Sequence, residues 1–233
     1  MFHTFFYEPL YNLLAIVLTY APLHDIGTAI VIVTLIVKGI LLPLNLSSLR
    51  TQYMMKKVEG EMKKIKELQK KDPQEASKQM IALYKKEKIN PFSSLFAMIL
   101  QIPIFFALYF VFSKGLVNDP ESLYSFAKFP ETLHTLAFGL FDVTQKNIIV
   151  AILAGLSSYA LARRQTVDMV VKKAAHEEGF QDQFMKSMKL QLLYVLPIII
   201  AVSGSFLPSA LALYWLVSNV VSYGQDVYMK NKL

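Results

Sequence analysis

One basic residue stands inside an otherwise apolar stretch of the chain. Lys38 lies in the middle of the sequence IVIVTLIVKGILLPL. An ammonium group at the centre of a bilayer costs about 2.5–3.5 kcal/mol on insertion scales, so its presence there needs a reason. On one continuous helix, Thr34 would lie one turn before Lys38, and Asn45 would follow on the same face. The three side chains predict a polar stripe that carries one fixed positive charge.

Further polar side chains recur at helical spacing in the other apolar stretches. They are Gln101, Ser157, Ser158, Gln191, Tyr194, Tyr214, Ser218, Asn219, Ser222 and Gln225. In hydrocarbon such groups turn towards one another or towards water. We therefore expect a water-accessible cavity at mid-membrane depth around Lys38. The alternative is that these groups only form hydrogen bonds that hold the helices together.

The sequence argues against several kinds of chemistry. The apolar runs at 26–44, 92–112, 148–162, 190–207 and 210–223 contain no acidic residue that could pair with Lys38 or carry a proton. The chain has no cysteine, and its four histidines lie outside these stretches, so neither a metal site nor a nucleophile with its base is expected. A glycine-rich phosphate loop is also missing. We expect no catalytic residues, no metal, no cofactor and no ATP-driven step.

The elements that must position these residues are apolar helices. Of the 233 residues, 54% are hydrophobic and only 18% are charged, which is typical of a membrane protein rather than of one soluble domain. A helix needs about 20 mostly apolar residues to cross a bilayer. We therefore expect an all-α polytopic membrane protein with five transmembrane helices, at residues 25–46, 91–114, 147–163, 189–207 and 208–226.

The first 24 residues form a separate apolar segment. No Lys or Arg precedes Lys38, which argues against a signal peptide. Glu8, Asn12 and Thr19 form one polar line, and the opposite face is rich in leucine. We expect residues 1–24 to form an amphipathic helix in the outer membrane interface, with a sixth span as the alternative.

The distribution of Lys and Arg over the connections predicts the orientation. Cytoplasmic loops retain basic residues. The counts are none in 1–25, twelve in 46–91, three in 113–147, six in 163–189 and two in 224–233. We therefore expect the N-terminus outside, an outer loop at 115–146, a cytoplasmic loop at 164–188 and a short cytoplasmic tail at 227–233.

The segment 47–90 is too long for a simple connector and has the apolar periodicity of two helices. Asp72 can cap the second helix, Pro73 suits its first position, and Glu75 would complete a capping box. We expect an antiparallel helical hairpin in the cytoplasm with a net charge of +6, from twelve basic and six acidic residues. Such a surface suits anionic headgroups or ribosomal RNA, whereas a solvated coiled coil is the alternative. The candidate contact residues are Lys56, Lys57, Lys63, Lys64, Lys85 and Lys86.

Four separate blocks of the chain resemble the YidC/Oxa/Alb family of membrane-protein insertases. The blocks are VKGILLPLNLSSLRTQYMMKK, LYKKEKINPFSSLFAMILQIPIFFALYFVF, MKLQLLYVLPIIIAVSG and LPSALALYWLVSN, and they occur in order over nearly the whole chain. The resemblance implies a core of five spans and a groove that is open to the cytoplasm and to lipid.

The resemblance also implies residue roles. The family's groove carries a basic residue, usually arginine, and the matching position here is Lys38, which keeps the charge but loses the planar guanidinium. The groove and substrate-contact positions would fall on Thr34, Gln101, Tyr214 and Trp215, and Ser218 continues this polar line.

Three features of many family members are missing from this sequence. They are a large outer domain, a lipoprotein cysteine and a long basic tail. We therefore expect the hairpin and the 163–189 loop to supply any ribosome contact.

Together these features favour an insertase of the inner (plasma) membrane. It would admit polar tails of newly made membrane proteins into a hydrophilic groove and release their transmembrane segments into lipid, without ATP. The expected partners are such clients, the lipid bilayer, the ribosome and the Sec translocon, and not DNA. One alternative is a small-solute channel or carrier with Lys38 as its anion site. Another is a scaffold that only docks the ribosome or the translocon.

Overall fold

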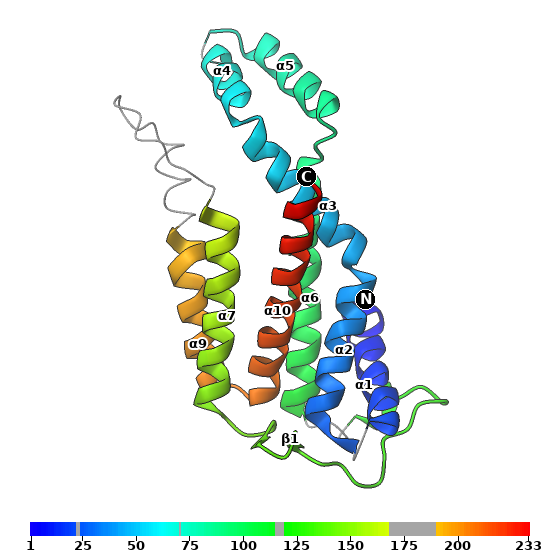
Figure 1. The fold of residues 1–233 in the computed structure, drawn as a ribbon. Coiled ribbons are helices and arrows are strands. Elements are labelled where there is room, and N and C mark those ends of the chain that lie inside the picture. Colours follow the sequence, from blue (N-terminus) through cyan, green and yellow to red (C-terminus); the bar gives the residue numbers. More distant parts are fainter. Residues whose placement is uncertain (22–23, 70, 115–118, 168–189) are drawn as a thin grey trace. The chain divides into compact units, whose positions relative to one another are not determined.

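The chain is almost entirely helical (Figure 1). The computed structural model describes all residues except 22–23, 70, 115–118 and 168–189, so most of the predicted 164–188 loop lies outside the described residues. The elements are η1 (His3–Tyr7), α1 (Glu8–Tyr20), α2 (Ile26–Ile40), α3 (Leu42–Lys57), α4 (Glu59–Gln69), α5 (Pro73–Lys86), α6 (Pro91–Lys114), η3 (Pro120–Ser122), β1 (Leu136–Ala137), β2 (Phe141–Asp142), α7 (Ile148–Val167), η4 (Gln191–Val195), α9 (Leu196–Phe206) and α10 (Ser209–Lys232).

These elements form two compact units. The first comprises residues 1–40 and 101–224, and the second comprises residues 41–100 and 225–233. The helices α6 and α10 each supply residues to both units. The fold class is all-α, as the sequence predicts.

In the first unit, α7 and α9 pack closely because small residues face each other. A side-chain carbon added at Gly155 would lie 2.7 Å from Cβ of Ala201, and one at Gly204 would lie 3.1 Å from Cβ of Ala151. Small residues at helix contacts let backbones approach, as is common between membrane helices.

The segment 119–147 fixes the ends of two helices in this unit. Asp25 accepts hydrogen bonds from the backbone N–H groups of Gly27 and Thr28 at the start of α2, and from that of Phe138 in the segment. Ser209 at the start of α10 donates its hydroxyl to the carbonyl of Asp142 at 2.9 Å. The N-terminal ends of α2 and α10 are therefore held by the same short piece of chain.

The polar line on α1 also binds this segment. Asn12 is buried, donates to the carbonyl of Ser122 at 2.8 Å and accepts from the backbone N–H of Tyr124. Thr19 donates to the carbonyl of Lys128. Tyr7 donates to Asp119, and burial, with that carboxylate as the second cause, raises the pKa of Tyr7 above its ordinary range. Asn12 and Thr19 thus serve in docking the 119–147 segment.

The first predicted span is not one straight helix. The helix α2 ends at Ile40 and α3 begins at Leu42, with Pro43 in the first turn of α3. Proline lacks the N–H that would continue the ladder and clashes with the preceding turn, which accounts for the break. The predicted stripe from Lys38 to Asn45 assumed one continuous helix, and that assumption is wrong.

In the second unit, α4 and α5 pack around a small apolar cluster. Val58, Leu83 and Ile89 are buried there, with Met62 and Ile65 among the partly buried side chains around them. The cluster includes Val58, Met62, Ile65 and Leu83, whose apolar periodicity predicted the two helices.

The predicted N-cap of α5 is confirmed. Asp72 accepts from the N–H groups of Gln74 and Glu75, and Pro73 occupies the first turn. The reciprocal half of the predicted capping box is wrong, because the N–H of Asp72 binds the carbonyl of Leu68 and the carboxylate of Glu75 accepts from Gln79.

Among the described residues, no single helix is both long and apolar enough to cross a membrane, although α2 and α3 meet that criterion together as a broken pair, by length and composition.

Candidate functional site

The ammonium group of Lys38 is largely buried and binds a hydroxyl group. Its side chain projects from α2, and only 8% of the residue's surface is exposed. The Nζ atom donates to Oγ of Ser222 on α10 at 3.0 Å. No ion pair to Lys38 occurs among the residues that the structure describes. A buried ammonium has three N–H donors, and Ser222 accepts from one of them.

Two further contacts join α6 to α10 in the same unit. The amide of Gln101 donates to the hydroxyl of Tyr214 at 2.5 Å. One turn along α6, the ring of Phe105 stacks on Trp215, with centroids 5.1 Å apart. The structure thus pairs Gln101 with Tyr214, two of the predicted groove residues, and places Trp215 in an aromatic stack.

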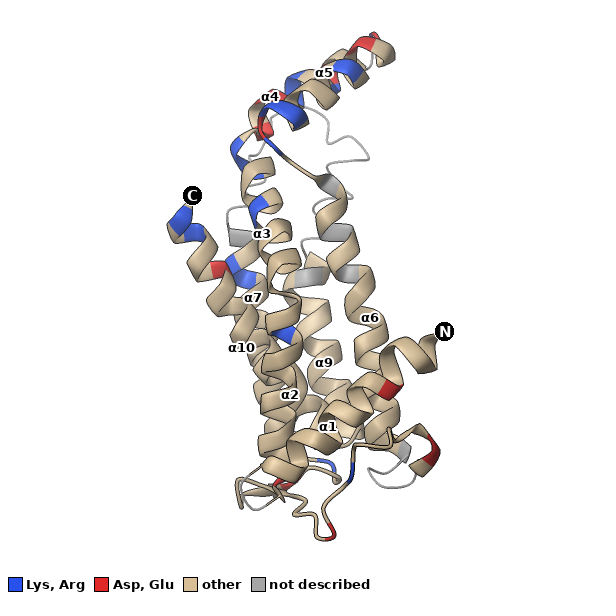
Figure 2. Ribbon diagram, turned by 90° about the vertical axis from the view of Figure 1, so that its right-hand side faces the viewer, with Lys and Arg blue, Asp and Glu red and all other residues tan. Residues whose placement is uncertain are grey.

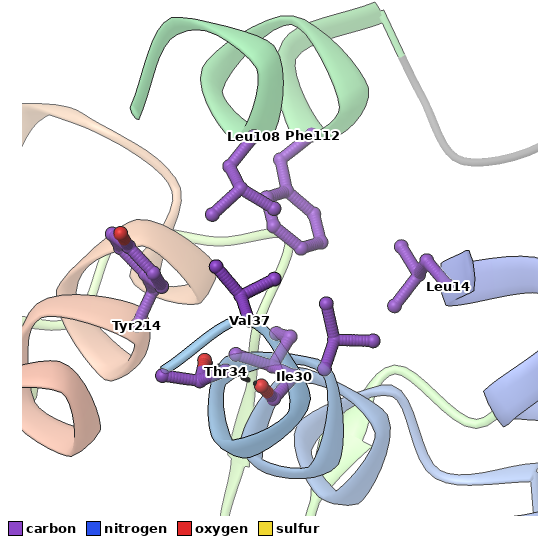
Figure 3. A pocket seen from close by; sticks show the side chains of 8 residues that line it. Leu14, Ile30, Thr34, Val37, Leu108, Phe112 and Tyr214 are labelled. Carbon is purple, nitrogen blue, oxygen red and sulfur yellow. Dashed lines mark hydrogen bonds between the residues drawn. The ribbon is translucent and has the colours of Figure 1, made fainter. Parts of the chain in front are cut away.

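Thr34 borders a small cavity between α1, α2, α6 and α10 (Figure 3). Its volume for water is about 10 Å³, which is enough for one molecule. Tyr214 and Thr34 are the polar residues in its lining, which is otherwise formed by apolar side chains: Leu14, Ile30, Val33, Val37, Leu108 and Phe112. The hydroxyl of Thr34 donates to the carbonyl of Ile30 in its own helix, and Lys38 is not part of this lining.

A third hydrogen-bonded pair connects α10 to α7. Asn219 donates to Oγ of Ser157 at 3.1 Å. Ser218, one turn after Tyr214 on α10, is buried. The polar residues of α10 therefore reach both α2, through Ser222, and α7, through Asn219. The interhelical hydrogen bonds anticipated as one alternative are present.

One acidic residue was missed by the sequence analysis. The helix α10 continues to Lys232, so residues 227–232 are helical rather than a separate tail. Asp226 lies in this continuation, is only 1% exposed, and accepts from the hydroxyl of Tyr53 on α3 at 3.0 Å in the second unit. Asp226 was not considered as a site residue because it follows the apolar run, which ends at Tyr223. A buried carboxylate needs a hydrogen-bond donor, and the Tyr53 hydroxyl supplies one.

The predicted basic contact residues lie on α3, α4 and α5, where charged residues gather (Figure 2). Lys57, Lys63, Lys64, Lys85 and Lys86 are exposed. Lys63 forms an ion pair with Glu59 at 3.0 Å, and Nζ of Lys56 lies 5.3 Å from the ring centroid of Tyr53. The five exposed lysines are therefore accessible to an anionic surface.

Apolar helices, a buried ammonium and polar pairs between helices are typical of helical membrane proteins. The model of the 60Kd inner membrane protein family matches residues 18–233. The chain therefore belongs to this family of inner membrane proteins, and the resemblance seen in its sequence blocks is confirmed.

Relatives in three bacteria carry the name membrane protein insertase YidC. The Clostridium tetani protein is 32% identical over 90% of this chain and 83% of its own length. The Streptomyces avermitilis protein is 30% identical over 87% of this chain and 50% of its own length. The Burkholderia multivorans protein is 29% identical over 97% of this chain and 36% of its own length. The chain thus spans most of the first relative and half or less of the other two.

Proposed function

We propose that this chain is a membrane protein insertase that works without nucleotide and is not an enzyme. Family membership and the names of the relatives support this proposal. The single observation that carries the mechanism is the ammonium of Lys38, which lies buried between α2 and α10 with a neutral hydroxyl as its partner.

The proposed role of Lys38 is to attract the acidic or polar tail of a client. Ser222 accepts one hydrogen bond from the ammonium, and a client carboxylate can accept the others. The bond from the ammonium to Ser222 is charged on the donor side only, whereas a bond to a client carboxylate would be charged on both sides, so a client carboxylate competes well with the hydroxyl. The fixed charge thereby lowers the barrier for moving a polar tail into the membrane.

The client's apolar segment then moves along the lipid-facing sides of α6 and α10. Ile102, Phe106 and Phe110 on α6 and Val220 on α10 are exposed and apolar. Burial of the client's own apolar surface supplies about 25 cal/mol per Å², which drives release without ATP.

The groove in this proposal opens when the client enters. The cavity beside Thr34 and Tyr214 holds about one water, which is far too little for a polypeptide. Entry would separate α6 from α10 and break the hydrogen bond between Gln101 and Tyr214. Thr34, Trp215 and Ser218 would then line the opened groove with Lys38.

We also propose the predicted topology of five spans, an outer N-terminus and a cytoplasmic C-terminus, with the chain in the inner (plasma) membrane. The count of Lys and Arg supports it, since twelve lie in 46–91 and none in 1–25. The α4–α5 pair would then be a cytoplasmic hairpin whose exposed lysines contact anionic headgroups, the ribosome or the Sec translocon.

The proposal is tested by reconstituting the purified chain alone into vesicles. We expect a small client with an acidic tail to become protected from protease inside these vesicles, and empty vesicles to give no protection. Flux of a small anion without client insertion would favour the channel or carrier. Ribosome binding without client insertion and without anion flux would favour the scaffold.

A further inference from the structure

The tip of the β-hairpin formed by β1 and β2 is apolar and exposed. Leu136, Phe138 and Leu140 are 54%, 51% and 80% exposed. The segment 136–141 reads LAFGLF and contains no charge. Gly139 is the usual type of turn residue, but the three large exposed apolar side chains around it are not typical of a tight turn and require an explanation.

The backbone at the tip is held in place rather than free to fold inward. Ala137 and Val143 are fully buried, and Leu140 donates its N–H to the carbonyl of Ala137 at 2.8 Å. Phe138 has a φ of +53° and donates its N–H to Asp25. Asn or Gly would adopt this left-handed backbone conformation at lower cost than Phe. The phenyl ring is therefore present at a position where the backbone disfavours it.

The tip is attached to the ends of apolar helices. Asp25, which binds Phe138, caps α2, and the backbone N–H of Ala210 in α10 donates to Val143 just after β2. In Figure 1 the label β1 stands beside the ends of α2, α7 and α10. The tip therefore lies at the level where these helices begin.

Exposed apolar side chains also occur at the ends of α7 and α9. Ile148 and Ile149 in the first turn of α7 are exposed, as is Phe206 at the end of α9. In a family of inner membrane proteins, exposed apolar side chains at helix ends fit the acyl chains of lipid.

We infer that the 136–142 hairpin is a lipid anchor: Leu136, Phe138 and Leu140 insert into the leaflet at this end of the helices and fix the depth of α2 and α10. The anchor is independent of the proposed client site, because none of its residues is hydrogen-bonded to Lys38 or Ser222 in the described structure. Its partner is the acyl region of the bilayer, not a protein.

The inference is tested by tryptophan fluorescence in the full chain. The sequence contains one tryptophan, so a Trp215→Phe background allows a single probe to be placed. Phe138→Trp and Leu140→Trp report from the tip, and Glu131→Trp, an exposed position before β1, is the matched control. Each variant is reconstituted into phosphatidylcholine vesicles with or without bromine on the acyl chains.

We expect acyl-chain bromine to reduce the emission of both tip probes at least two-fold, and iodide in the water to quench only the control. Tip probes that iodide quenches as strongly as the control would overturn the anchor. Tip probes that neither quencher reaches would also overturn it, because they would be buried against protein. Insertion activity plays no part in this readout.

Discussion

At the scale of single residues, the partner of Lys38 determines what the ammonium can do. A serine hydroxyl holds the nitrogen in one place but does not neutralise it. An acidic partner would have cancelled the charge.

Ser222→Ala should weaken the attachment between α2 and α10. A hydrogen bond to a charged group contributes about 1.5–3 kcal/mol, so we expect a fall of this size in the free energy of unfolding, measured in detergent or vesicles. Ser222→Thr keeps a hydroxyl and serves as the control. In a Lys38→Met background, Ser222→Ala should have little effect. An equal loss in both backgrounds would show that the bond to Lys38 is not the cause.

The residue types of the site could be predicted from sequence, but their pairing could not. An isolated lysine among apolar residues is visible in a linear sequence. The bond between Lys38 and Ser222 joins positions 184 residues apart and depends on how α2 and α10 pack. The same holds for Gln101 and Tyr214, which are 113 residues apart.

At the scale of elements, contact between α7 and α9 depends on glycine. Gly155→Ala would place a methyl group 2.7 Å from Cβ of Ala201 and 3.0 Å from the carbonyl of Pro197. We expect a loss of about 1–3 kcal/mol in the free energy of unfolding, because one helix has to shift. Gly224→Ala is the control, since its added carbon meets nothing within 4 Å. A melting temperature for Gly155→Ala equal to that of the control would contradict this packing.

The docking of α1 depends on one buried amide. Asn12→Leu would leave the carbonyl of Ser122 and the N–H of Tyr124 without this partner. An unsatisfied buried group costs about 1–3 kcal/mol, so the variant should melt at lower temperature and be cut sooner by protease in the 119–128 segment. Thr19→Ala, at an exposed position, should change both measurements much less. Unchanged cleavage of Asn12→Leu would show that α1 docks by other contacts.

The sequence predicted the boundary of a helix well where a single residue type determines the local backbone conformation. The cap at Asp72 is an example, because a carboxylate followed by proline suits the start of a helix. The break at Leu41 was missed, since the apolar run continues across it and Pro43 is the only local sign. The extension of α10 to Lys232 was missed because its last turns are polar and lie outside the apolar run.

At the scale of the whole molecule, the chain's lack of cysteine makes its proposed topology directly testable. Thr4→Cys and Lys146→Cys should react with a membrane-impermeant thiol reagent added outside cells. Lys78→Cys, on α5, should react only after the cells are opened. All three positions are exposed on the protein. Labelling of Thr4→Cys only in opened cells would instead place the N-terminus inside and indicate a sixth span.

The fixed charge of Lys38 is the central claim for the molecule as a whole. The decisive measurement is insertion of a client with an acidic tail into vesicles that contain the wild-type chain, Lys38→Arg, Lys38→Ala or Lys38→Glu at equal density. The account predicts near wild-type insertion for Lys38→Arg, a reduction of about ten-fold for Lys38→Ala, as expected for a loss of about 1.4 kcal/mol of stabilisation, and a larger loss for Lys38→Glu. Insertion by a folded Lys38→Glu chain at the wild-type rate would contradict it.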